Sequence, residues 1–221
     1  LAIIKSNGED EINFGPSGSL DYTMAERSLL ESAMQKAHAC DGPVPLTGVF
    51  AEAAGLVTQK HAYAVKAFLK DHGLSARDID LLGFHGQTIL HRPDEKYTCQ
   101  IGDGRALARL SGIDVVGDFR SADMLAGGQG APLAPLYHKA LSAKLLGEDN
   151  IAVLNIGGVG NVTFVNAEGM LAFDTGPGNA LLDDWMMSKT GRPLDAQGET
   201  ARSGVVHDEL LSVWMRHPYF N

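Results

Sequence analysis

The chain has 221 residues, 44% of them hydrophobic and 20% charged, which is enough to bury a core and to form one large or two small domains. Its net charge of −9 with no basic cluster disfavours a nucleic-acid or anionic-membrane partner, and its short, interrupted apolar runs predict no transmembrane helix. Cys40 and Cys99 form no disulfide framework and no signal peptide is recognisable, which favours a cytosolic protein with reduced thiols.

The amino-terminal part predicts a β-hairpin followed by two helices. Residues 1–15 hold two apolar segments around an Asn-Gly turn, the pattern of a hairpin. Apolar side chains at helical spacing predict a helix over residues 23–39, and Thr23 with Glu26 three residues later fits a capping box at its start. A Pro/Gly segment then leads to a longer amphipathic helix over residues 50–73.

Two apolar strands with polar exits come next. Residues 79–84 and 113–117 predict these strands, and residues 104–112 predict a short helix between them. A glycine loop at residues 127–133 leads into a further helix, with Pro132 expected near its first turn. Because strands alternate with helices, we expect an α/β fold whose sheet is parallel or mixed and carries helices on its faces.

The remaining sequence predicts a second domain. The polar segment at residues 145–150 is the expected boundary, which gives domains over residues 1–147 and 148–221. Residues 153–165, VLNIGGVGNVTFV, predict a strand, a glycine-rich turn and a second strand. Residues 173–179, FDTGPGN, end an apolar stretch, and their Gly-Pro-Gly is expected to open a helix.

The polar turns of the predicted first domain are candidate binding loops, because ligands of open α/β sheets bind at the carboxyl ends of strands. His85 and Gln87 can hydrogen-bond a small polar ligand, or can merely satisfy backbone groups in a tight turn. Arg120 offers a fork of donors suited to a carboxylate or phosphate, or forms an internal ion pair with Asp118 or Asp123 that braces the loop. The sequence leaves both pairs of alternatives open.

The turn NIGGVGN is a candidate phosphate-binding hairpin. It has no Walker lysine and no GxGxxG spacing, so it is neither a P-loop nor a Rossmann fingerprint. Its backbone amides can line up against phosphate oxygens, although a plain hairpin turn explains the sequence equally well. The residues singled out in this turn are Asn155, Gly157, Gly158 and Asn161.

Asp174 is the candidate catalytic residue. It follows an apolar stretch, where a carboxylate can act as general base on a hydroxyl group or water, typically worth about 10²–10⁴-fold in rate. It can instead cap the following helix, or be one of several solvated acids together with Asp183 and Asp184.

Five segments follow one another over nearly the whole chain: FHGQTILHRP, QIGDG, GIDVVGDFRSADMLAGGQGAPL, VLNIGGVGNVTFV and FDTGPGNALLDDW. In this order they resemble the signatures of the anhydro-N-acetylmuramic acid kinase family. The resemblance implies the two-lobed, actin-like or ribonuclease H-like ATPase fold of the sugar kinase/Hsp70/actin superfamily. It also implies an ATP-dependent kinase that hydrolytically opens 1,6-anhydro-N-acetylmuramic acid and phosphorylates O6. The product, N-acetylmuramic acid 6-phosphate, is an intermediate of peptidoglycan recycling.

The resemblance also implies roles for the candidate residues. Asp174 would deprotonate the attacking water, and the NIGGVGN turn would hold part of the ATP triphosphate. Mg²⁺ would arrive with the nucleotide, with no metal ligand singled out in the sequence, and the protein would be a cytoplasmic homodimer. The residues expected to line the sugar site are His85, Gln87, Arg120 and Asp123.

We expect the chain to be a piece of a longer protein, holding most of lobe one and the opening of lobe two. It starts without methionine in what looks like the middle of a strand, and the family's SGTSxDGxD loop would lie before Leu1. The second lobe would continue past Asn221. The alternative is a non-catalytic fragment that binds a muramyl sugar or serves only as a structural lobe. An unrelated ATPase of the same superfamily is a third reading.

Overall fold

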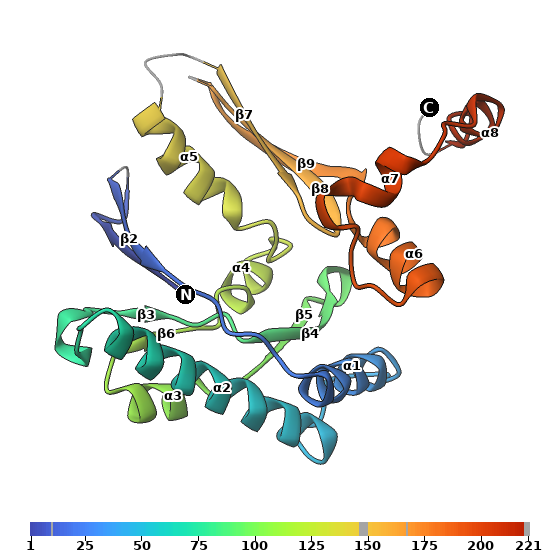
Figure 1. Ribbon diagram of the computed structural model, residues 1–221. Coiled ribbons are helices and arrows are strands. Elements are labelled where there is room, and N and C mark those ends of the chain that lie inside the picture. Colours follow the sequence, from blue (N-terminus) through green and yellow to red (C-terminus); the bar gives the residue numbers. More distant parts are fainter. Residues whose placement is uncertain (10, 146–149, 167, 219–221) are drawn as a thin grey trace. The chain divides into compact units, whose positions relative to one another are not determined.

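The computed structural model (Figure 1) is α/β, which confirms the predicted fold class. It describes residues 1–9, 11–145, 150–166 and 168–218. The chain divides into two compact units, Leu1–Leu146 (unit 1) and Gly147–Asn221 (unit 2). Within the described residues, no helix has the length and apolar character needed to cross a bilayer.

Unit 1 contains six strands and five helices within its described residues. The strands are β1 (Ala2–Ser6), β2 (Ile12–Ser17), β3 (Leu82–Gly83), β4 (Gln87–Arg92), β5 (Tyr97–Ile101) and β6 (Val115–Val116). The helices are α1 (Met24–His38), α2 (Val49–Asp71), α3 (Gly104–Ser111), α4 (Ser121–Leu125) and α5 (Ala134–Leu145), with 3₁₀ turns at Ala76–Asp78 and Pro93–Glu95. The predicted amino-terminal hairpin, the two long helices and the short α3 are all confirmed.

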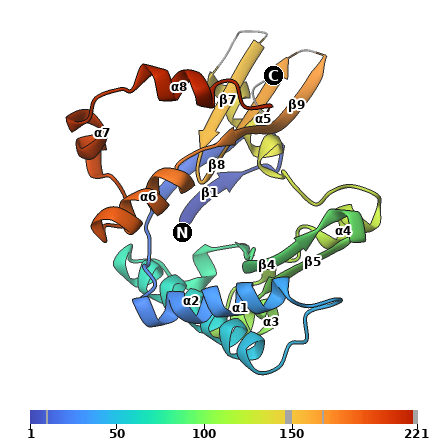
Figure 2. The ribbon, with the colours of Figure 1, turned by 90° about the vertical axis from the view of Figure 1, so that its right-hand side faces the viewer.

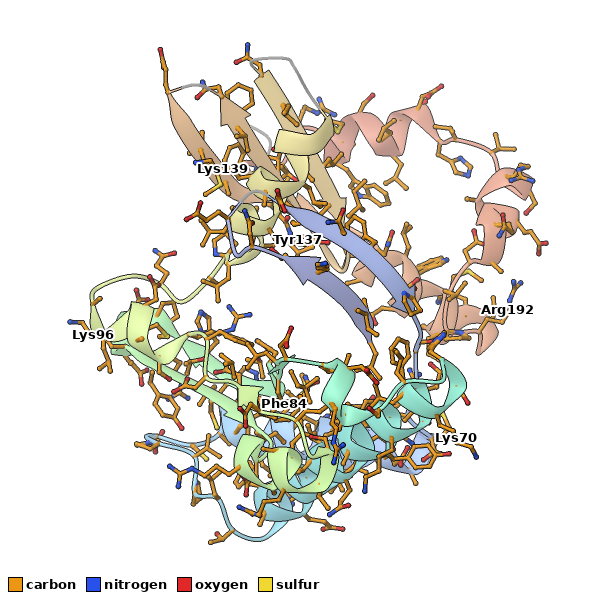
Figure 3. The ribbon with its side chains drawn as sticks, turned by 90° about the vertical axis from the view of Figure 1, so that its left-hand side faces the viewer. Lys70, Phe84, Lys96, Tyr137, Lys139 and Arg192 are labelled. Carbon is orange, nitrogen blue, oxygen red and sulfur yellow. The ribbon has the colours of Figure 1, made fainter. Side chains whose placement is uncertain are left out.

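The core of unit 1 lies where α1, α2 and α3 pack with the hairpin of β4 and β5. Helices α1 and α2 lie side by side, and α3 packs on α2 (Figure 2). Phe84, just after β3, is buried among these elements (Figure 3), and its ring meets that of His61 edge to face, with centroids 4.9 Å apart. Buried members of this core are Leu30, Ala33, Val57, Leu90, Ile101 and Leu107.

The strands of unit 1 form small separate sheets rather than the expected larger one. Among the described residues, the only parallel pair is β3 with β6, joined through Leu82↔Val115. β4 and β5 form an antiparallel hairpin that is not among the elements predicted from the sequence. Helix α5 begins at Ala134, so Pro132 lies two residues before it, near its first turn as predicted, and Pro135 lies within that turn.

Unit 2 is a three-stranded antiparallel sheet followed by helices. The strands, in the order β7-β8-β9, are β7 (Asn150–Ile156), β8 (Val159–Asn166) and β9 (Gly169–Pro177). The helices are α6 (Ala180–Thr190), α7 (Glu199–Ser203) and α8 (Asp208–Trp214), with a 3₁₀ turn at Ala196–Gly198. The predicted strand–turn–strand unit is confirmed, but β9 runs through Asp174 to Pro177. Helix α6 therefore starts later than the Gly-Pro-Gly sequence suggested.

A polar cluster joins the start of α1 to α2. The Thr23 hydroxyl accepts the Glu26 N–H (3.3 Å), and the Glu26 carboxylate accepts the Thr23 N–H (2.7 Å), which is the predicted capping box. The Lys60 ammonium of α2 donates to both oxygens of the same carboxylate, at 2.7 and 2.9 Å. Glu26 thus caps its own helix and binds the neighbouring one.

Replacing Thr23 by Ala should lower the free energy of unfolding by about 1 kcal/mol, the usual loss when an N-cap threonine becomes alanine. Chemical denaturation followed by circular dichroism measures this change. Thr23→Ser keeps the acceptor oxygen and is the matched control, which should stay close to wild type. Identical denaturation midpoints for wild type and Thr23→Ala would contradict the capping role.

The contribution of Glu26 should depend on pH. Hydrogen bonds from Lys60 and from the Thr23 backbone hold the pKa of Glu26 below its ordinary value. Such a carboxylate stabilises the fold fully above its unfolded-state pKa, and this effect disappears as the pH falls through the folded-state pKa. The difference in melting temperature between wild type and Glu26→Gln should therefore be constant near neutral pH and shrink in acid. Glu31→Gln, on the same helix, controls for net charge; a difference that grows in acid would contradict the assignment.

Candidate functional site

Unit 1 contains an open pocket of about 720 Å³. Phe84 lies on its wall, together with backbone at the end of β5 and the start of α3. The pocket is polar enough for a small hydrophilic ligand, because side chains with hydrogen-bonding or charged groups lie around it. These side chains are His85, Gln100, Asp103, Arg105, Asp118 and Ser121.

Gly86 lets the strand-end turn approach β5 closely. Its φ is +70°, and a Cβ atom at this position would lie 2.5 Å from the carbonyl oxygen of Ile101. Any side chain would therefore push the turn away from β5. Because Gly86 is the next residue, His85 is fixed on the pocket wall while β4 begins immediately afterwards.

Arg120 connects this turn to the glycine loop. Its Nε donates to Nε2 of His85 (3.0 Å), and its Nη1 donates to the carbonyl oxygen of Gly130 (2.5 Å). Asp123 binds the same glycine from the other side, since its Oδ2 accepts the Gly130 N–H at 2.7 Å. Three of the four residues predicted for the sugar site, His85, Arg120 and Asp123, are thus brought together in one hydrogen-bonded network.

The four predicted sugar-site residues differ in their relation to the pocket. His85 lines it, whereas Gln87, Arg120 and Asp123 are not among its lining residues. Gln87 is half-buried at the start of β4, where its side-chain Nε2 donates to the Thr88 carbonyl at 3.2 Å. Their assignment to the sugar remains a prediction.

Some pocket residues were not proposed from sequence. Asp118 has a φ of +52° and accepts the hydroxyl of Ser121 on one carboxylate oxygen. Gln100 donates to the Thr98 hydroxyl at 2.7 Å, and Asp103 caps α3 by accepting the Ala106 N–H at 2.9 Å. Gln100 and Asp103 both lie in the segment QIGDG. This segment contributes to the family resemblance, but it contains no motif that by itself indicates a binding site.

In unit 2, the turn between β7 and β8 is bound to the start of α6. The Gly157 carbonyl accepts the Asn179 N–H at 2.7 Å, and the Gly158 carbonyl accepts those of Gly178 (2.9 Å) and Ala180 (3.3 Å). A Cβ atom on Gly178 would lie 2.2 Å from the Gly157 oxygen, so only glycine fits there. The turn has no side chains, and the Gly158 N–H has no hydrogen bond among the described residues, so it can donate to a phosphate oxygen.

The polar residues predicted in unit 2 form a row across the sheet. The register opposes Asn155 to Asn161 and Asn161 to Asp174, and directly opposed residues place their side chains on the same face. An irregularity between Gly160 and Asn161 lies beside this row, a feature that re-aims side chains near active sites.

Asp174 has the free lone pairs that a general base needs. Its side chain is exposed, and within the part of the chain that the structure describes it makes no hydrogen bond or ion pair. It does not cap α6, because Asn179 stands at that helix start. The same described residues contain no group of three or more His, Cys, Asp or Glu that could hold a metal ion.

Comparison with known proteins identifies the family. The family model described as anhydro-N-acetylmuramic acid kinase matches residues 46–221. A protein of that name from Methylobacterium nodulans is 51% identical over 207 residues, which are 93% of this chain and 55% of the relative. Another from Rhodopseudomonas palustris is 49% identical over 221 residues, all of this chain and 60% of the relative.

A third relative of the same name, from Paramagnetospirillum magneticum, is 46% identical over 222 residues, which are all of this chain and 59% of the relative. The chain therefore spans between 55% and 60% of the length of these three relatives. The family match and the identities over nearly all of this sequence agree with each other, and the chain belongs to the anhydro-N-acetylmuramic acid kinase family.

Proposed function

We propose that this protein uses ATP to phosphorylate 1,6-anhydro-N-acetylmuramic acid on O6 while water opens the anhydro bond. The observation that carries the proposal is Asp174, an exposed carboxylate without a hydrogen bond among the described residues, in line with two asparagines across the sheet. The names of the relatives, anhydro-N-acetylmuramic acid kinase, supply the substrate class.

The chemistry assigned to Asp174 is removal of a proton from water. The oxygen of that water attacks the anomeric carbon, the bond between this carbon and O6 breaks, and its electron pair stays on O6. O6 then attacks the γ-phosphorus of ATP, and ADP leaves. Capture by phosphorus removes the charge that develops on O6, so a separate acid is not required on that side.

The turn at Gly157 and Gly158 is assigned to ATP. Because its glycines have no side chains, phosphate oxygens can approach it. The Gly158 N–H, which makes no hydrogen bond to any described residue, is one donor for them. Asn155 and Asn161 border this turn on the two strands and are assigned to the same ligand. Mg²⁺ arriving with ATP would offset phosphate charge, without protein ligands that the structure identifies.

The sugar is assigned to the pocket of unit 1. His85 lies on the pocket wall and accepts a hydrogen bond from Arg120. Asp123 is linked to Arg120 through Gly130. Gln87 belongs to the same strand-end turn. A domain boundary near residue 147 and a cytoplasmic location, both predicted from the sequence, belong to the proposal. A role in peptidoglycan recycling and a homodimer complete it, and these two follow from the resemblance alone.

Asp174→Asn should lower kcat by about 10² to 10⁴-fold, the usual contribution of a general base, because an amide cannot take the proton. Sugar binding, measured by calorimetry, should stay close to wild type. A coupled assay of ADP release with ATP and the anhydro sugar measures the rate. Asp184→Asn, at an exposed position of α6, is the matched control.

Near-normal turnover of Asp174→Asn would remove this residue from the mechanism. Absence of turnover in wild-type protein that still binds the sugar would instead support the alternative, a protein that binds a muramyl sugar without catalysis.

Gly178→Ala should weaken ATP binding more than sugar binding. The added methyl group would overlap the Gly157 carbonyl, so the turn must move away from α6. Overpacking of this kind costs about 1–3 kcal/mol of stability. The KM for ATP and the thermal midpoint measure the two effects. Gly158→Ala is the control for stability, because its methyl group would lie 3.5 Å from the Ala180 Cβ, an ordinary contact distance, and its thermal midpoint should equal that of wild type. An unchanged KM for ATP in both variants would exclude the turn from the nucleotide site.

A further inference from the structure

Both ring nitrogens of His85 are occupied by protein groups. Nε2 stands 3.0 Å from Nε of Arg120, and Nδ1 stands 3.0 Å from the Gly86 carbonyl oxygen. A guanidinium group only donates hydrogen bonds, so Nε2 must accept. A carbonyl oxygen only accepts, so Nδ1 must carry the proton. These two partners define a neutral imidazole with its proton on Nδ1.

Arg120 is itself held from the other side. Its Nη1 donates to the Gly130 carbonyl, and the Gly130 N–H is in turn bound by Asp123. Arg120 is half-buried and does not line the pocket, whereas His85 does. The rigid fork of arginine makes both bonds at once, which the single ammonium of lysine cannot reproduce.

We propose that Arg120 is a positioning residue for His85 rather than a ligand of the sugar carboxylate. It selects the Nδ1–H form of the imidazole and fixes the ring plane on the pocket wall, with Gly130 as its anchor. The tautomer part of the inference is independent of the proposed function, and only its kinetic consequence rests on it. Arg120 then affects a bound sugar only indirectly, because it sets the position of the His85 ring and determines which ring nitrogen carries the proton.

Imidazole nitrogen shifts in the ¹⁵N-histidine-labelled protein test the tautomer directly. The His85 signals are assigned by their loss in His85→Gln. In wild type we expect Nδ1 in the protonated range and Nε2 in the unprotonated range. In Arg120→Ala the pattern should move toward the Nε2–H form that unconstrained histidine favours, and Arg120→Lys should not restore it. Arg109→Ala removes an exposed arginine of α3 and should leave the pattern unchanged.

A double-mutant cycle tests the kinetic consequence. Arg120→Ala should lower kcat/KM for the sugar by about tenfold or more, the effect of losing a hydrogen bond to a charged group. If Arg120 acts through His85, the double variant with His85→Ala should be no worse than the poorer single variant, within about twofold. Independent roles would instead multiply the two losses.

The inference is overturned by an Nε2–H form of His85 in wild type, by an unchanged pattern in Arg120→Ala, or by losses that multiply. The wild-type spectrum decides the first point even if a variant does not fold. Failure of the kinase proposal gives a different result. Wild-type protein would then not phosphorylate the sugar, while the nitrogen shifts would still report the hydrogen bond between Arg120 and His85.

Discussion

Backbone approaches backbone at two turns so closely that no side chain fits between them, and the candidate sites depend on this constraint. In unit 1, Gly86 faces the Ile101 carbonyl, and in unit 2, Gly178 faces the Gly157 carbonyl. The first contact sets His85 on the pocket wall. The second joins the glycine turn to the start of α6. Because β8 also pairs with β9, the turn assigned to phosphate and the strand that carries Asp174 belong to one hydrogen-bonded unit of backbone.

The parts of the fold that the sequence predicted well are those whose contacts are local. The capping box needs only Thr23 and Glu26, three residues apart, and the hairpin turn at Gly157 and Gly158 needs only its two flanking strands. The pairing of Leu82 with Val115 could not be predicted from local sequence, because each of these two-residue strands is defined by a partner strand that is distant in the sequence. The β4–β5 hairpin was missed because its turn carries no Asn-Gly signal.

For the site, the sequence supplied residue types but not their bonds. His85, Arg120 and Asp123 were grouped as sugar ligands, with an internal Arg–Asp ion pair as the alternative. In the structure Arg120 and Asp123 form no direct ion pair; each binds Gly130 instead, Arg120 at the carbonyl and Asp123 at the N–H. Their contact with the sugar stays a prediction. A loop backbone can bind two opposite charges at once, because its carbonyl accepts from a cation and its N–H donates to an anion. No spacing of residues in the sequence predicts such an arrangement.

The bonding state of each side chain separates two kinds of role. A group that must take a proton needs an unoccupied lone pair, and Asp174 has no hydrogen bond among the residues that the structure describes. A side chain that shapes a pocket wall instead needs hydrogen bonds, because each bond restricts the rotation of the side chain. Both ring nitrogens of His85 make such bonds. The two residues therefore fit different tasks although both follow apolar strand residues. Exposure alone would not have told them apart, because both side chains are exposed.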